Sequence, residues 1–189
     1  MFELYDELET EVEIEGTTYQ LNMSFDNIKK LLDLLGESTL TDGEKLYYGL
    51  LRLLGTELDL EIEKQVTVFQ FLIENFVHGE DKQEIPVDLE GNVMPAAPLP
   101  INYDLTHDAR YIYTSFKQAY GIDLRDERGK LDWRDFKLLL CDLPDDTKFK
   151  QVIDIRSRPY PKGKGMGEER RKLKELKRMF ALPNATFDE

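Results

Sequence analysis

The chain has 189 residues, of which 41% are hydrophobic, and a formal net charge of -13 at pH 7. That length suffices for one sizeable domain or two small ones. The single cysteine, Cys141, excludes an intramolecular disulfide, and no apolar run approaches the roughly 20 residues that a membrane-spanning helix needs. Residues 1–15 are acidic and lack the pattern of a signal peptide, so we expect a cytoplasmic protein.

Charge is distributed unevenly along the chain. Residues 1–100 contain 22 acidic and 6 basic residues, whereas residues 101–189 contain 16 acidic and 19 basic residues. Most of the basic excess lies in residues 156–178. An acidic front and a basic rear suggest self-association or a charged partner, although ordinary solvation of surface faces would give the same counts.

The beginning of the chain predicts a β-hairpin. Apolar residues alternate with glutamates over residues 11–15, and a Glu-Gly pair provides a two-residue turn. The resulting register pairs Ile14 with Thr17 and Val12 with Tyr19. An isolated hairpin is marginal in water, so we expect this one to lie on helices or to extend a sheet.

Two amphipathic helices follow the hairpin. Ser24 or Asp26 caps the first, which ends near Gly36, and its inward face consists of Ile28, Leu31, Leu32 and Leu35. Thr41 and Glu44 form a capping box that opens the second helix. Its predicted inward face consists of Tyr47, Leu50, Leu51 and Leu54, and it ends near Gly55.

A third helix completes an acidic N-terminal lobe over residues 1–79. It is apolar around much of its circumference, which favours a central position, and its apolar residues are Val66, Phe69, Leu72, Ile73, Phe76 and Val77. Residues 80–101 then break the pattern with four prolines. We interpret them as a linker, because a structureless stretch of that length inside a compact domain is unusual.

The C-terminal lobe, residues 102–189, is again helical. The predicted helices begin at Asp104 or Thr106, after the N-cap Asp132, at Asp145 or Asp146, and at about Glu168. Their apolar faces contain Ala109, Ile112, Tyr113, Phe116 and Tyr120, then Trp133, Phe136, Leu139 and Leu140, then Phe149, Val152 and Ile153, and finally Leu173, Leu176 and Phe180. The sequence thus predicts a mainly α protein with an N-terminal β-hairpin and two helical lobes joined by a Pro-rich linker.

Residues that carry catalytic or metal chemistry are scarce. Asp104, His107 and Asp108 have a spacing that could share a metal ion, but aspartates at a helix start are favoured as caps anyway. Cys141 has no base nearby in sequence and is expected to be a buried or half-buried structural thiol. We therefore predict no enzymatic activity, no catalytic residues, no metal and no cofactor.

Two glycine-containing segments resemble ligand loops only superficially. Residues 123–133 fail the calcium-loop pattern at its first ligand, and the glycines at 163, 165 and 167 lack the spacing of a phosphate-binding loop. The helix that follows is basic, through Arg170, Arg171, Lys172, Lys174, Lys177 and Arg178. These six residues are the candidate binding residues, either for nucleic acid or for an acidic protein surface such as the first lobe of a second copy.

Several segments of the second lobe resemble a phage family. They are residues 108–116 (DARYIYTSF), 120–124 (YGIDL), 129–133 (GKLDW) with Phe136, the Leu143-Pro144 pair, 147–149 (TKF) and 153–156 (IDIR). The chain is similar to the bacteriophage "Gp fifteen" family of long-tailed, siphovirus-type phages and prophages of Gram-positive bacteria. Members are encoded between the major tail protein and the tape-measure protein.

The resemblance implies a tail assembly chaperone. Such a chaperone would bind the tape-measure protein, and possibly the tail tube protein, in the host cytoplasm and would be absent from the mature virion. We also expect a homo-oligomer, no membrane partner and no nucleic acid. Two alternatives stay open: a structural tail component retained in the virion, and a nucleic-acid-binding protein that uses the basic C-terminal helix.

Overall fold

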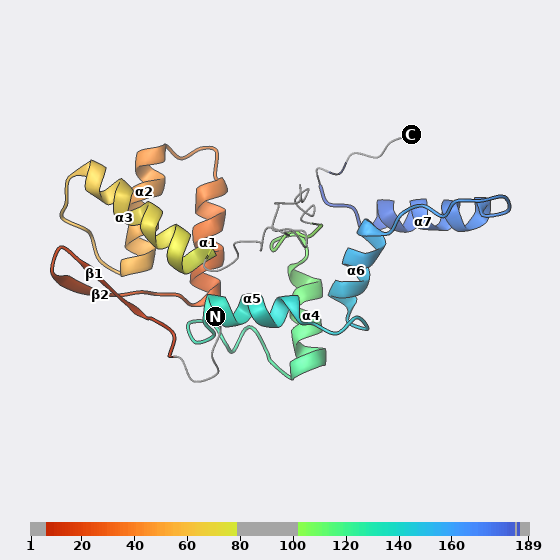
Figure 1. Cartoon of the computed structure of the whole chain (residues 1–189), viewed down its shortest axis with the longest axis horizontal. Helices are drawn as coiled ribbons and strands as arrows, with labels where there is room; N and C mark the ends of the chain where they lie inside the picture. The colour runs from red at the N-terminus through yellow and green to blue at the C-terminus, as the bar shows by residue number, and fades with distance from the viewer. Residues whose placement is uncertain (1–6, 79–101, 184, 186–189) are drawn as a thin grey trace, which may run out of the picture. The chain divides into compact units, whose positions relative to one another are not determined.

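The computed structural model describes residues 7–78, 102–183 and 185 (Figure 1). Within these ranges the chain forms seven α-helices, one π-helical segment and a two-stranded sheet. The predicted mainly α fold with an N-terminal hairpin is therefore confirmed. The predicted linker, residues 80–101, lies outside the described residues. Among the described helices, none combines the length and apolarity that crossing a bilayer would need.

The chain divides into two units. Of the described residues, 7–78 and 127–138 belong to the first unit, and 102–126 and 139–185 belong to the second. Residues 127–138 thus join the first unit, whereas the sequence assigned them to the C-terminal lobe. The reason is a set of hydrogen bonds between segments that are far apart in the sequence. The backbone N–H of Phe25 donates to the Leu131 carbonyl at 2.9 Å, and the backbone N–H of Trp133 donates to the Met23 carbonyl at 2.7 Å.

The hairpin has the predicted register. Strands β1 (Glu11–Ile14) and β2 (Thr17–Gln20) are antiparallel, with Ile14 opposite Thr17 and Val12 opposite Tyr19. The two turn residues, Glu15 and Gly16, both have positive φ, at 47° and 81°. Such a turn matches the twist of the flanking strands. Ile14 is buried, so the hairpin contributes one apolar face to the first unit.

Three helices and the π-helical segment form the rest of the first unit's N-terminal part: α1 (Phe25–Gly36), α2 (Asp42–Leu54), α3 (Ile62–Leu72) and η1 (Ile73–His78). The capping box of Thr41 and Glu44 is present at the start of α2. Four side chains of the core have no exposed surface: Ile28, Leu31, Leu53 and Leu72.

Two predicted helix faces are correct only in part: Leu50 and Leu54 of the second helix and Leu72, Phe76 and Val77 of the third are buried as expected. On α2 the buried side contains Leu46 and Leu53, and Tyr47 is 42% exposed, because α2 packs on α1 through the side that carries Gly49. Helix α3 is not central: within it only Leu72 is buried, and Val66 is 39% exposed. It contacts α2 along one side and leaves apolar residues on the other.

Helix α5 (Trp133–Cys141) begins in the first unit. Phe136 stacks on Phe25, with ring centroids 5.1 Å apart, and the Trp133 Nε1–H donates to the Val77 carbonyl at 2.8 Å. Cys141 at its end is exposed, so the expected buried thiol is wrong. The buried face of α5 follows Trp133 and Phe136, and the cysteine lies off that face.

The second unit contains α4 (Ala109–Tyr120), α6 (Lys148–Ser157) and α7 (Gly167–Met179). Its buried side chains include Ile112, Phe116, Phe149 and Val152. Helix α4 starts later than predicted, because Asp104 and Thr106 belong to a turn that precedes it, and Ala109 is exposed rather than inward. Helix α6 likewise begins after the N-cap Thr147.

Candidate functional site

The basic helix α7 carries all six candidate binding residues. Glu168 and Glu169 lie in its first turn, and Lys177 and Arg178 lie in its last turn. This arrangement complements the helix dipole and favours a helix in a sequence of low mean hydropathy. Only Leu173 is buried, so most of the helix surface is available to a partner.

Three of the six residues contact their own chain. Arg170 donates to the Pro161 carbonyl at 2.9 Å, and Lys172 forms an exposed ion pair with Glu168 at 2.9 Å. Lys177 donates to the Arg156 carbonyl at 3.0 Å. Arg170 and Lys177 therefore help to attach α7 to the segment that precedes it.

The other three residues form a stripe. Arg171, Lys174 and Arg178 follow one another at i, i+3 and i+7, which places them along one side of the helix. Among the residues that the structure describes, none of the three has an ion-pair partner. We call these three residues the basic stripe. Glu175 lies on the same side of the helix. The exposed apolar residues Met179, at 68%, and Leu176, at 37%, lie further around the helix.

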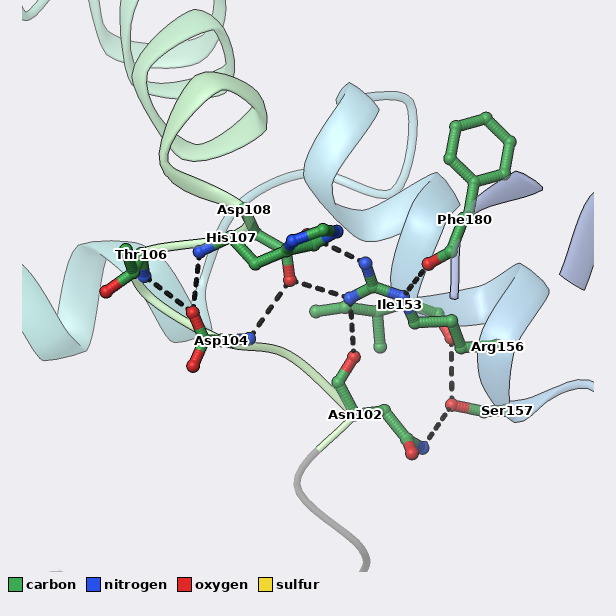
Figure 2. Close-up of polar contacts among 9 residues, drawn as sticks. All are labelled: Asn102, Asp104, Thr106, His107, Asp108, Ile153, Arg156, Ser157 and Phe180. Carbon is green, nitrogen blue, oxygen red and sulfur yellow. Dashed lines mark hydrogen bonds and ion pairs between the residues drawn. The ribbon is translucent and has the colours of Figure 1, made fainter. Parts of the chain in front are cut away.

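An arginine on α6 anchors the end of α7 (Figure 2). Arg156 binds the carboxylate of Asp108 through both terminal nitrogens, at 2.6 and 2.7 Å. The two side chains are 7% and 0% exposed. Such a bidentate charge-assisted pair is stronger and more directional than a lysine contact would be.

The same guanidinium also reaches two backbone carbonyls. Its Nη1 donates to Asn102 at 2.9 Å and its Nε donates to Phe180 at 2.5 Å. The ring of Phe180 lies edge-on to Tyr111 and under the Lys148 ammonium, which is 4.6 Å from its centroid. Arg156 thus joins the segment before α4, helix α6 and the residue that follows α7.

The residues considered for a metal site have other roles. Asp104 accepts hydrogen bonds from the backbone N–H groups of Thr106 and His107, at 2.8 and 2.6 Å. Asp108 accepts from the Asp104 N–H at 3.0 Å and pairs with Arg156 (Figure 2). Within the described residues no group of three metal-ligating side chains occurs.

Sequence reasoning did not select Arg156. One signal could have revealed it: Arg156 continues the inward stripe of α6, seven residues after Phe149 and four after Val152. A charged residue at such a position requires a buried partner. The partner, Asp108, is 48 residues away, so the pair itself could not be read from spacing.

The first unit has a separate surface feature, a pocket with a volume of about 290 Å³. It is lined by Tyr47, Leu50, Leu51, Glu57, Leu58, Asp59 and Gln65. The Tyr47 hydroxyl donates to the Glu57 carboxylate, and this hydrogen bond raises the pKa of Tyr47. The pocket therefore combines an apolar wall of leucines with two carboxylates.

Comparison with known families identifies the chain at the family level. The family described as "Bacteriophage Gp15 protein" matches residues 4–182. Comparisons with curated proteins and with solved structures gave no match. The match extends beyond the C-terminal lobe, residues 102–189, where the sequence resemblance was found, and covers nearly the whole chain. The chain therefore belongs to the bacteriophage Gp15 protein family.

Proposed function

We propose that this phage protein is a non-enzymatic tail assembly chaperone that binds the tape-measure protein and self-associates in the host cytoplasm. Family membership supports a phage role, and the resemblance implies a gene position beside the tape-measure protein. Tape-measure proteins are long and helical, so a partner needs apolar surface that accepts amphipathic helices.

The observation that carries the proposal is the uncovered apolar side of α3. Ile62 is 56% exposed and Val66, one turn later, is 39% exposed. Residues four apart lie one above the other on a helix, so these two form a short apolar strip. Monomeric proteins rarely leave extended apolar patches in water, and such patches commonly bind other proteins.

The test is binding of the recombinant tape-measure protein of the same phage. We expect wild-type protein to retain it in a pull-down, and the double variant Ile62→Asp with Val66→Asp to lose retention. The matched control is Thr67→Asp with Gln70→Asp, which changes exposed polar residues of the same helix by the same charge. Equal retention by both variants would contradict a role for the strip, and no retention by wild-type protein would contradict the function.

Mass spectrometry of purified phage particles separates a chaperone from a structural tail component. A chaperone leaves before the tail is complete, so its peptides should be missing from particles that contain tail tube peptides. Stoichiometric amounts in the particle would instead establish a virion component.

The basic stripe favours a second candidate function, binding of nucleic acid. Clustered Arg and Lys side chains bind phosphates, and such binding weakens steeply with salt. Retention on DNA that is lost on replacing Arg171, Lys174 and Arg178 by alanine would support it. The chain's net charge of -13 opposes it, because repulsion from DNA acts on the whole protein.

A further inference from the structure

The pocket of the first unit lies at the start of an acidic segment. Glu57 and Asp59 line it, and Glu61 and Glu63 follow at alternate positions. All four residues are exposed. The volume of about 290 Å³ is at the lower end of the roughly 300–1,000 Å³ of small-molecule sites, so one or two large side chains would fill it. The pocket suits an apolar side chain that is flanked by cations.

Helix α7 offers that combination. Met179 and Leu176 are exposed on it, and Arg178 is adjacent to Met179 in sequence. Methionine is unbranched and adapts to irregular apolar pockets. The basic stripe extends over eight residues, or about 10 Å of helix, and lacks ion-pair partners among the described residues.

The contacts of Arg156 and Lys177 hold α7 in a fixed position before it binds a partner. Arg156 holds the Phe180 carbonyl and Lys177 holds the Arg156 carbonyl, so the end of the helix that carries Met179 is fixed to α6. A binding element that is already ordered loses less conformational entropy when it docks. Burying the ion pair of Asp108 and Arg156 costs desolvation free energy. Its presence beside the end of α7 fits a helix that must keep one position.

We propose that α7 of one copy docks on the pocket of the first unit of a second copy. Met179 enters the pocket, and the basic stripe faces the carboxylates of Glu57, Asp59, Glu61 and Glu63. The proposal rests on the self-association that forms part of the proposed function, and it names the two surfaces. Charge complementarity favours a second copy of the chain as the partner, since 22 acidic residues precede residue 101 and most of the basic excess lies in residues 156–178.

The interface is head-to-tail, because the two surfaces that meet are different. The pair of copies therefore keeps one free pocket and one free α7 after a first contact. Heterologous contacts of this kind close into rings or continue as open chains. Either product would present many copies of the α3 strip along a long helical partner.

The test uses pure, nuclease-treated full-length protein without any tape-measure protein. Light scattering coupled to size-exclusion chromatography should show a mass that rises with protein concentration at about 0.05 M salt and falls at about 0.5 M salt. Reversal of the stripe (R171E, K174E and R178E) should weaken association roughly tenfold or more. Reversal of the pocket segment (E57K, D59K and E61K) should do the same.

Mixing the two variants provides the decisive measurement. Each reversed surface is complementary to one on the other variant, so the mixture should regain the large mass that neither variant shows alone. The matched control, R110E with K162E and K164E, has the same charge change off α7 and should associate like wild-type protein. Circular dichroism checks that every variant is folded.

Three results would overturn the proposal. They are a wild-type monomer at all concentrations, an unchanged mass for either reversed variant, and a mixture that stays dissociated. Salt-sensitive retention of a monomer on DNA would assign the basic stripe to nucleic acid instead. Failure to bind tape-measure protein would leave these masses unaffected, so the two proposals fail independently.

Discussion

The two units of this chain are stabilised in different ways. The first unit has a core in which Leu31, Leu53 and Leu72 have no exposed surface and the rings of Phe25, Phe136 and Trp133 stack, and it leaves apolar residues of α3 outside. The second unit also packs aromatic rings, but it adds a buried ion pair between Asp108 and Arg156. The first unit thus retains unused apolar surface, whereas the second uses a directional contact to fix an exposed basic helix.

The difference indicates two kinds of binding surface. An apolar strip tolerates many partner helices, because burial of apolar area is not directional. A row of cations on an anchored helix selects partners by charge and is sensitive to salt. The single tryptophan, Trp133, lies in the first unit, so its fluorescence reports on that unit, and hydrogen exchange in α4 and α6 reports on the second.

Removing the ion pair should produce the largest effect. Arg156→Met leaves the Asp108 carboxylate buried without a neutralising cation, so we expect the second unit to lose about 3–5 kcal/mol of stability. Hydrogen exchange in α6 and α7 should accelerate, while the unfolding midpoint seen by Trp133 fluorescence should stay near that of wild-type protein. A similar loss of stability by Trp133 fluorescence and by hydrogen exchange would show that the units unfold together.

Two companion variants sharpen this result. Arg158→Met removes an ion pair in which both side chains are 54% exposed, so it should change stability by less than about 0.5 kcal/mol. Adding Asp108→Leu to Arg156→Met removes the unpaired charge and should recover part of the loss. No recovery would mean that packing and the two backbone contacts of Arg156, rather than charge, hold the unit.

A substitution that leaves a cavity in the core of the first unit should lower the stability of that unit. Leu53→Ala should lower its stability by about 2–5 kcal/mol, because the side chain is fully buried. Ile62→Ala should have almost no effect on stability, because Ile62 is exposed and belongs to the proposed binding strip. Urea unfolding followed by Trp133 fluorescence measures both. A large loss for Ile62→Ala would show that α3 is covered by its own unit.

A smaller effect is expected where α2 and α3 meet. A Cβ at Gly49 would lie 2.7 Å from an atom of the Phe69 ring and 3.4 Å from Leu31, so Gly49→Ala should destabilise the first unit by about 1–3 kcal/mol. Gly43 is in the same helix and has nothing within 4 Å of such a Cβ. Gly43→Ala should therefore be neutral or slightly stabilising in the same urea measurement.

Local features were predictable from sequence, and packing between distant segments was not. The hairpin register and the capping box of Thr41 and Glu44 depend on residues within a few positions of each other, and both predictions are confirmed. The face of α2 was misassigned in part, because Leu46 and Tyr47 are both apolar enough to be buried, and only the position of α1 decides between them. Periodicity cannot supply that position.

The candidate site shows the same division. Composition alone located the basic residues of α7, and their helix was predicted nearly as observed. Arg170, Lys172 and Lys177 differ from the basic stripe because they contact Pro161, Glu168 and Arg156 in the folded chain. Sequence alone does not show these contacts. The anchor itself joins Arg156 to Asp108 across 48 residues, beyond the reach of any local pattern.

The smallest predicted effect is a pH dependence in the second unit. The Lys117 ammonium, the Arg125 N–H and the Tyr113 hydroxyl all donate to Asp123, and these hydrogen bonds lower its pKa from 3.8 to about 2. A lowered pKa in the folded state stabilises that state above the unfolded pKa, and this contribution is lost as pH falls through the folded value. Asp123→Asn should therefore be less stable than wild-type protein at about pH 6, and the difference should vanish between about pH 5 and pH 2. Urea unfolding followed by circular dichroism across that range would show it, and a difference that stays constant with pH would mean that the carboxylate charge is not what Lys117 stabilises.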